Sequence, residues 1–282
     1  MSTKLILIEG LPGSGKSTTA RIVHDILKDK GINVELFSEG DYNHPADYDG
    51  VAYFNNEAFN NLQQSHFKSW SILENIKIKH CNGYLIPFRK AIEEQAIPLG
   101  DELFKDITKN DIYELPIGIH TNLILNRWSE FVNHYINEDK VVIFECCFIQ
   151  NPVTVSMIKN NSPKDTTMSY IHSLAEIIAS LNPVLIYVEQ KDIKVSFNRV
   201  INERPKEWLE GFIHYYTNQG YGLNNDLKKL DGVIQILEAR RNLEHEIYES
   251  LTLTKYTIDN SDFDLNLHKE KINYIFEKHL NL

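Results

Sequence analysis

One stretch of nine residues constrains this chain more than any other feature. Residues 10–18 read Gly-Leu-Pro-Gly-Ser-Gly-Lys-Ser-Thr and match the pattern Gly-x-x-x-x-Gly-Lys-Ser/Thr. An apolar run, Leu5–Ile8, precedes the stretch, and residues 22–27 after it show an amphipathic helical stripe. A chance match in a glycine-rich turn would seldom have a strand before it and a helix after it. The sequence therefore predicts a phosphate-binding loop.

Each residue type in this loop has a predicted task. Glycines permit backbone angles and close approaches that a β-carbon would block. Backbone N–H groups at the start of a helix attract phosphate oxygens. Lys16 is expected to reach the β- and γ-phosphates, and the Ser17 hydroxyl to ligate Mg²⁺. The predicted phosphate-binding residues are Gly10, Gly13, Ser14, Gly15, Lys16, Ser17 and Thr18.

Five short apolar runs predict the fold. Their apolarity is continuous rather than alternating, which is typical of parallel strands covered on both faces. The segments between them are mostly helical, so we expect an α/β fold with a five-stranded, doubly wound parallel sheet. The predicted strands are Leu5–Ile8, Val34–Phe37, Val141–Phe144, Val184–Val188 and Tyr256–Ile258.

The second and third predicted strands are too far apart for a single crossover helix. Residues 55–135 contain helical patterns that are broken at Pro87, Pro98 and Pro116. We interpret this segment as a helical insertion that shapes the acceptor site. Because no linker or repeat separates it, residues 1–282 are expected to form one domain.

The stretch from Ile8 to Thr18 resembles the P-loop kinases, particularly thymidylate kinase and its nucleoside-kinase relatives. The whole chain also looks like uncharacterised P-loop kinase-like proteins of Gram-positive bacteria. The first resemblance is sharp around the loop, topological over the rest of the core, and does not cover the insertion. It implies a P-loop NTPase fold of the nucleotide-kinase type, with ATP and Mg²⁺ as cofactors and a lid over the nucleotide.

Two carboxylates at strand ends are candidates for the proton acceptor or for holding Mg²⁺ through water. Asp41 follows the second strand, where several P-loop kinases carry an Asp in that role, although an acidic solvated turn would explain it too. Glu145 ends the third strand and resembles the acid of the nucleoside kinases' Glu-Arg-Ser motif, but no Arg follows it. A Glu at the end of a buried strand is costly unless it is paired. Glu39, His44 and Asp47 are weaker candidates.

Residues 192–222 follow the fourth strand and are expected to form the lid. Arg199 and Arg204 resemble the lid arginines of P-loop kinases, which stabilise the charge on the transferred phosphoryl group. Ordinary ion pairs on a helix surface are the alternative. Asp192 is positioned to cap the helix and Pro205 to end it.

Charge and cysteine content limit the possible partners and location. The formal net charge is −10, which argues against nucleic acid as the main partner and against a polynucleotide-end kinase. The three cysteines, Cys81, Cys146 and Cys147, do not form a disulfide framework, and we expect the adjacent pair to be core residues. The first apolar run is too short for a signal peptide or a membrane span. We expect a cytoplasmic protein.

These features together predict an ATP-dependent small-molecule kinase. The partners are then a nucleoside triphosphate and a small-molecule acceptor such as a nucleoside, a nucleotide, a sugar-like metabolite or an antibiotic. The alternative is a nucleotide-dependent switch or sensor that hydrolyses slowly and binds a protein. A GTPase is disfavoured because no Asn-Lys-x-Asp motif is present.

Overall fold

The computed structural model describes residues 2–279, which form two compact units. The first unit comprises the chain up to Glu39 and from Trp128 onward, and the second comprises Gly40–Arg127. Helix α6, Ile117–Tyr135, begins in the second unit and ends in the first. The sequence predicts a single domain with an insertion at residues 55–135. The compact second unit instead comprises residues 40–127.

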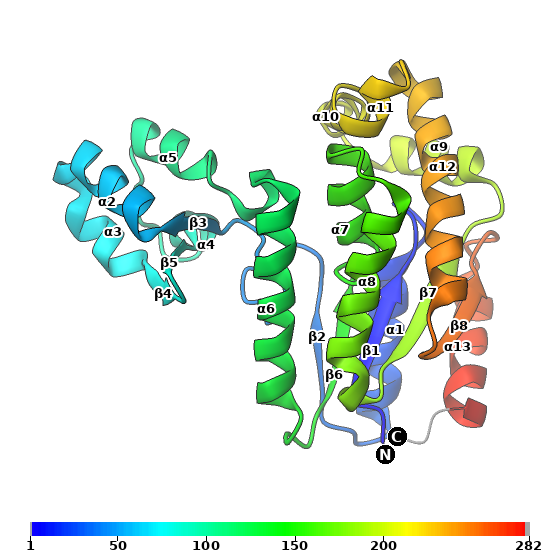
Figure 1. Cartoon of the computed structure of the whole chain (residues 1–282). Coiled ribbons are helices and arrows are strands. Elements are labelled where there is room, and N and C mark those ends of the chain that lie inside the picture. The colour runs from blue at the N-terminus through cyan, green and yellow to red at the C-terminus, as the bar shows by residue number, and fades with distance from the viewer. Residues whose placement is uncertain (1, 280–282) are drawn as a thin grey trace. The chain divides into compact units, whose positions relative to one another are not determined.

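The first unit contains a five-stranded, all-parallel sheet (Figure 1). Its order is β2-β6-β1-β7-β8, so β1 lies in the centre. All five predicted strands are confirmed, and four of them extend one to three residues further than predicted. The strands are β1 Leu5–Glu9, β2 Val34–Phe37, β6 Val141–Glu145, β7 Val184–Glu189 and β8 Thr254–Asp259.

Helical segments of the first unit connect these strands. The stretch after β6 includes a π-helical turn, η3, a form that is often found at functional sites. The segments are α1 Lys16–Asp29, α7 Gln150–Val153, η3 Thr154–Lys159, α8 Lys164–Ile178, η4 Ala179–Leu181, α9 Ile193–Glu203, α10 Lys206–Thr217, α11 Gly220–Asn224, α12 Lys229–Ser250 and α13 Leu265–His279.

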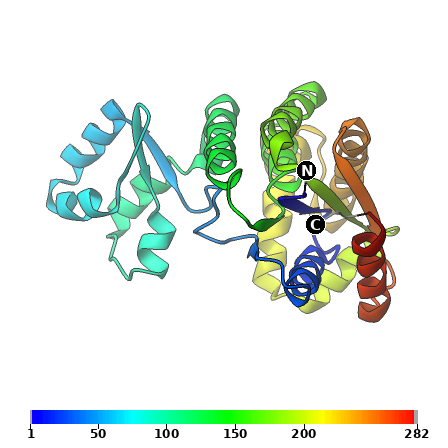
Figure 2. The same ribbon diagram turned by 90° about the horizontal axis from the view of Figure 1, so that it is seen from below.

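Helices cover both faces of this sheet, which explains why its inner strands β1, β6 and β7 are apolar up to their last residue. Figure 2 shows α1 and α13 on one side and α8 and α12 on the other. On the first face, Ile6 and Ile186 join Val23 of α1 and Ile272 of α13 in one buried cluster. On the second face, the ring of Phe144 packs against residues of α6 in the first unit. The doubly wound fold is confirmed.

The strand order sets the position of the glycine-rich loop. The chain leaves β1 toward β2 and β6 on one side and reaches β7 and β8 on the other. Ligands of open α/β sheets bind where the strand order reverses in this way, beyond the carboxyl ends of the strands. Ile8 of β1 pairs with Glu145 of β6, so this carboxylate ends its strand level with the start of the loop.

The second unit corrects the prediction of a helical insertion. It contains a three-stranded antiparallel sheet of order β3-β5-β4 in addition to its helices. Its own apolar core includes Phe54, Phe59 and Ile86. Its elements besides α6 are β3 Ala52–Asn55, α2 Asn56–Ser65, η1 Phe67–Ser69, α3 Trp70–Ile76, β4 Ile78–His80, β5 Gly83–Ile86, α4 Phe88–Glu93, α5 Asp101–Thr108 and η2 Ile112–Glu114.

Among the helices of residues 2–279, none combines the length and the apolarity that crossing a bilayer requires. The cysteine prediction is confirmed within the same residues. Cys146 and Cys147 are buried and free, and Cys81 is exposed and free.

Leu7→Ala should destabilise the first unit strongly. Leu7 lies on the central strand and has 0% exposure, so its loss leaves a cavity that costs about 2–5 kcal/mol. Leu223→Ala on α11, where the side chain is 63% exposed, is the matched control and should change little. Chemical denaturation monitored by circular dichroism measures both. Equal effects would contradict a core centred on β1.

Candidate active site

The loop between β1 and α1 has the conformation that its glycines predict. Gly10 and Gly15 have φ angles of 145° and 99°, which residues with a side chain seldom adopt. A β-carbon on Gly15 would lie 2.5 Å from Asn260 Nδ2, and one on Gly10 would lie 2.4 Å from the carbonyl oxygen of Val188. The loop ends at Lys16, where α1 begins and presents its first N–H groups. This geometry suits an anion.

Lys16 is folded back against the loop. Its side chain is buried, and Nζ donates a hydrogen bond to the carbonyl oxygen of Leu11 at 2.9 Å. Burial opposes the charge of Lys16, but acidic groups around it, including Glu39, Glu145 and Glu9, raise its pKa. The ammonium group therefore stays protonated beside the loop.

Ser17 and Glu145 meet at the mouth of the loop. The Ser17 hydroxyl donates to Glu145 Oε1 at 2.5 Å, although 128 residues separate them in sequence. Glu145 has only 2% exposure. The next residue, Cys146, has a φ of 70°, a strained value for a residue with a side chain, so the chain turns sharply after β6. The Ser17 hydroxyl is therefore the partner that a carboxylate at the end of a buried strand was expected to need.

Glu39, Glu145 and Cys146 form a potential metal-binding cluster, because one ligand atom from each lies within 4.8 Å of the others. Burial raises the pKa of the Cys146 thiol well above its usual value, so the sulfur stays protonated. It contacts Glu39 Oε2 at 3.4 Å as a donor. The remaining donors are carboxylate oxygens and the Ser17 hydroxyl, which suit a hard cation such as Mg²⁺.

A pocket of about 910 Å³ opens at this site within the first unit. Of the predicted catalytic residues it brings together Lys16, Glu145, Arg199 and Arg204, and it also includes Ser17, the predicted Mg²⁺ ligand. Among the predicted phosphate-binding residues, Gly13, Gly15, Lys16, Ser17 and Thr18 line it. Gly10 and Ser14 lie in the loop but are not part of the pocket lining.

The two lid arginines line the pocket and also have ordinary partners. Arg199 Nε donates to Glu203 at 2.8 Å, and its guanidinium lies 3.8 Å from the ring centroid of Phe263. Arg204 lies 5.9 Å from the ring centroid of Trp208. Asp192 caps α9 by accepting from the Val195 N–H at 2.9 Å, and α9 ends before Pro205, as predicted.

Asp41 belongs to the second unit. Its carboxylate accepts a hydrogen bond from the Asn43 N–H at 2.8 Å, an arrangement typical of an acidic turn. Its role at the loop stays a prediction. Glu39, two residues earlier, lines the pocket of the first unit and accepts from Gln150 Nε2 at 3.0 Å.

Comparison with known proteins agrees with this architecture. A family model described as "Chromatin associated protein KTI12" matches residues 3–69, which include the loop. The probable adenylyl-sulfate kinase of Aeropyrum pernix is 25% identical over 134 residues, which cover 45% of this chain and 72% of that protein. The loop, the strand order and this relative lead to one conclusion. The chain has a P-loop kinase-like fold.

Two solved structures are similar to this P-loop kinase-like chain over most of their length. Thymidylate kinase from Candida albicans is 13% identical, with a TM-score of 0.43, and the match covers 98% of this chain and 92% of that one. A sugar kinase from Janibacter sp. HTCC2649 is 13% identical, with a TM-score of 0.38 and coverages of 98% and 96%. Similarities this low carry no inference about ligands.

Glu9 is a buried carboxylate of this P-loop kinase-like fold that the sequence analysis missed. It ends β1 with 0% exposure and accepts hydrogen bonds from the N–H groups of Phe148 at 2.7 Å and Gln150 at 2.8 Å. It thereby holds the segment after β6 against β1. Burial raises its pKa to about 7 despite these bonds. The rule applied to Glu145, that an acid ending a buried strand needs a partner, would have identified Glu9.

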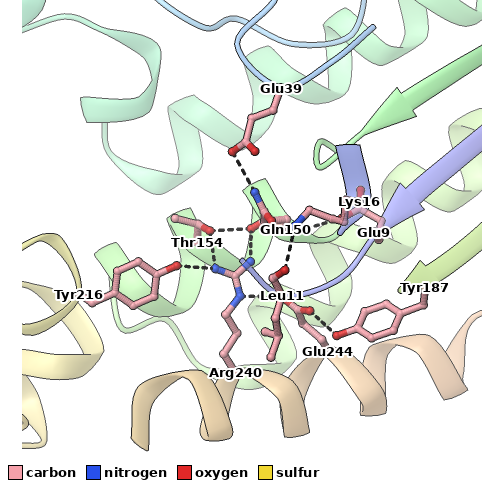
Figure 3. Close-up of polar contacts among 10 residues, drawn as sticks. All are labelled: Glu9, Leu11, Lys16, Glu39, Gln150, Thr154, Tyr187, Tyr216, Arg240 and Glu244. Carbon is pink, nitrogen blue, oxygen red and sulfur yellow. Dashed lines mark hydrogen bonds and ion pairs between the residues drawn. The ribbon is translucent and has the colours of Figure 1, made fainter. Parts of the chain in front are cut away.

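Arg240 of α12 lies at the centre of a group of polar contacts with residues of several other elements (Figure 3). It is fully buried and donates to Glu244 at 2.6 Å, an ion pair that raises its pKa although burial opposes the charge. It also donates to the Gln150 carbonyl at 2.9 Å, the Thr154 hydroxyl at 2.9 Å and the Tyr216 hydroxyl at 3.0 Å. These last three residues line the pocket. One buried charge therefore fixes residues from α7, η3 and α10.

No pattern in the sequence singles out Arg240. An Arg and a Glu four residues apart on a helix usually form an exposed ion pair, and only the covering by other elements buries this one.

Chemically, the site can hold a triphosphate tail and a hard cation side by side. The loop and Lys16 provide positive charge, while Ser17, Glu39 and Glu145 provide oxygen ligands. Such an arrangement supports phosphoryl transfer by positioning and electrostatics.

Glu9→Gln should change how stability depends on pH. The pKa of Glu9 rises from 4.5 to about 7 on folding, so the folded state retains the proton more firmly. Its contribution to stability is therefore greatest at low pH and falls as the pH rises from about 5 to 7. Over that range the wild type should lose on the order of 3 kcal/mol relative to the variant, which cannot ionise. Urea unfolding of both proteins at several pH values measures the difference. Parallel curves would contradict the raised pKa.

Proposed function

We propose that this chain is a Mg²⁺- and ATP-dependent kinase that transfers the γ-phosphoryl group to a hydroxyl or phosphate of a small molecule. The observation that carries the proposal is the 2.5 Å hydrogen bond from Ser17 to Glu145, beside the charged amine of Lys16. A P-loop hydroxyl and a strand-end carboxylate in contact are the pair that holds Mg²⁺ in P-loop NTPases. The kinase-like relative supports the same activity.

In this proposal the loop and Lys16 bind the phosphates. The Lys16 amine exchanges the Leu11 carbonyl for phosphate oxygens, which are stronger acceptors because they are charged. Ser17 would ligate Mg²⁺ directly, and Glu145 would hold it directly or through water. Mg²⁺ held by these two residues would neutralise charge on the transferring group. Arg199 and Arg204 would stabilise the remaining charge from the lid.

The proton acceptor is proposed among the carboxylates near the strand ends. Glu145 is already hydrogen-bonded to Ser17, which favours the metal-holding role for it. Glu39 also lines the pocket and is held by Gln150, so it is an additional candidate beside Asp41. Only a correctly positioned group contributes to general base catalysis.

The acceptor would occupy the part of the pocket that is lined by Gln150, Asn151, Thr154, Trp208 and Phe212. These side chains combine amide and hydroxyl groups with aromatic rings, a mixture that suits a polar small molecule with a flat apolar part. We propose that the protein works in the cytoplasm, where its three free cysteines stay reduced.

The alternative is a nucleotide-dependent switch that binds a protein partner. The match of residues 3–69 to a family described as chromatin associated, rather than as an enzyme, favours this candidate. A switch would use the same loop but would release free phosphate instead of a phosphorylated small molecule.

A transfer screen distinguishes the two functions. The protein is incubated with γ-labelled ATP, Mg²⁺ and panels of nucleosides, nucleotides, sugars and aminoglycoside-like compounds. A labelled acceptor supports the kinase. Free phosphate alone, with a rate that no small molecule changes, supports the switch.

Lys16→Ala should weaken ATP binding by roughly tenfold or more and abolish transfer, because the variant lacks the buried charge beside the loop. Lys30→Ala, at the other end of α1, removes an exposed lysine and is the matched control. Calorimetric titration and the transfer assay provide the two measurements. Undiminished binding or transfer by Lys16→Ala would exclude the proposed site.

Carboxylate variants test the assignment of roles. Glu145→Gln should reduce turnover by ~10² or more and weaken the dependence on Mg²⁺, while ATP binding without metal stays near the wild-type value. Either Glu39→Gln or Asp41→Asn should reduce turnover similarly without changing the Mg²⁺ dependence. Steady-state rates over a range of Mg²⁺ concentrations measure both effects. Wild-type rates in all three variants would refute the assignment.

A further inference from the structure

The carbonyl oxygen of Ser14, in the glycine-rich loop, is held by two side-chain amides. Asn260 Nδ2 donates to this oxygen at 2.9 Å, and Gln190 Nε2 donates to it at 3.1 Å. All three residues are buried. Gln190 directly follows β7 and Asn260 directly follows β8, so the ends of two strands reach the same peptide group. We call Gln190 and Asn260 the amide clamp.

The two residues of the amide clamp are also bonded to each other and to the sheet. A side-chain amide has two N–H donors, and Gln190 Nε2 also donates to the Asn260 carbonyl at 2.8 Å. The Asn260 N–H donates to the Glu189 carbonyl at 3.0 Å. A β-carbon on Gly15 would lie only 2.5 Å from Asn260 Nδ2, so this amide packs directly against the loop. The sheet therefore fixes where the clamp holds the Ser14 oxygen.

The position of the Ser14 oxygen decides where the next N–H group points. In a trans peptide the C=O and N–H bonds point in opposite directions, and residues 2–279 contain no cis peptide bond. An oxygen directed at the amide clamp therefore directs the Gly15 N–H away from the clamp. Gly15 lines the pocket and immediately precedes α1, where backbone N–H groups attract a phosphate.

Gly15 gives this peptide group the freedom to rotate. Its φ and ψ angles are 99° and 21°, and a glycine adopts negative φ angles as readily. A rotated Ser14–Gly15 peptide would present its carbonyl oxygen to the phosphates instead of its N–H. Two donors on the oxygen oppose this rotation. They also polarise the peptide, which makes its N–H a stronger donor to an anion.

We propose that Gln190 and Asn260 are positioning residues for phosphate binding, which hold the Ser14 carbonyl so that the Gly15 N–H donates to the phosphates of the bound nucleotide. Neither side chain has to touch the ligand in this role. The inference rests on the proposed function, because it assumes a triphosphate on the loop. The competing explanation is that the clamp only pairs a buried carbonyl, which predicts lower stability of its variants with unchanged phosphate affinity.

The test removes the donors with substitutions that keep the volume. Leu fills nearly the space of Asn and Met nearly that of Gln, so Asn260→Leu and Gln190→Met each delete one hydrogen bond to Ser14. Calorimetric titration without metal measures binding of inorganic tripolyphosphate, which has phosphates but no base, and of ATP. For both ligands we expect affinity to fall about threefold in each variant and roughly tenfold in the double variant, the effect of one and of two hydrogen bonds. Wild-type affinity in the folded double variant, or a loss confined to ATP, would overturn the inference.

Asn33→Leu is the matched control. Asn33 Nδ2 also donates to a backbone carbonyl, that of Asp139, at 2.9 Å, but Asn33 precedes β2 at the opposite end of the sheet. Urea unfolding compares the stability of this variant with that of the clamp variants. Asn33→Leu should bind tripolyphosphate as the wild type does. A loss of affinity equal to that of the clamp variants would show a general effect of lost hydrogen bonds and would overturn the inference.

A measurement on the wild type needs no variant. The amide proton of Gly15 should move downfield in the NMR spectrum when tripolyphosphate binds, because its N–H then donates to an anion. The double variant should lose most of this shift, which a role in stability alone would leave unchanged. A Gly15 resonance that does not move in the tripolyphosphate-bound wild type would overturn the inference.

Failure of this inference differs from failure of the proposed function. ATP binding that depends on Lys16 but is unaffected in the double variant would overturn the role of the amide clamp alone. ATP binding that is absent, or unaffected by Lys16→Ala, would overturn the triphosphate site and the inference with it. Weakened binding in the clamp variants of a protein that phosphorylates no small molecule would support the clamp and overturn the kinase.

Discussion

The hydrogen bond between Ser17 and Glu145 is the interaction on which the arrangement of the site depends. It joins the first turn of α1 to the carboxyl end of β6. The contact forms because β6 pairs with β1 in a register that sets Glu145 beside Ile8. At Cys146, which has a positive φ angle, the chain turns away from β6 directly after Glu145. The loop, the proposed cation ligands and the amine of Lys16 all lie around this point.

Buried charges hold the wall of the pocket in place. Glu9 fixes the segment after β6 through two backbone N–H groups, and Arg240 fixes the next turns through Gln150 and Thr154. Burying an ion pair such as Arg240 with Glu244 adds little net stability, although breaking it is costly. A well-packed apolar core would stabilise the fold as well, so the charges serve to specify the position of this segment.

Local patterns predicted the main sheet well and the second unit poorly. Continuous apolar runs mark the inner strands β1, β6 and β7, because both faces of these strands are covered. Strand β4 has no such run, β5 has only the three residues Tyr84–Ile86 before Pro87, and the proline-broken segment was interpreted as helical. A signal was present: Asn82-Gly83 is a dipeptide typical of tight hairpins, and here Asn82 ends the turn and Gly83 begins β5, paired with His80. A sheet of three short strands depends on pairing between segments, which periodicity within one segment does not report.

The sequence by itself determined the glycine loop, the five parallel strands and the candidates Lys16, Ser17, Glu145, Arg199 and Arg204, because each follows from spacing along one stretch or from the end of a strand. Tertiary structure decided that Glu145 is hydrogen-bonded to Ser17 and that His268 is hydrogen-bonded to Thr19. It also decided that Glu9 and Arg240 are buried. These contacts join residues on different elements, up to 249 positions apart for Thr19 and His268. They arise from strand order and helix packing, and a local pattern of residues encodes neither.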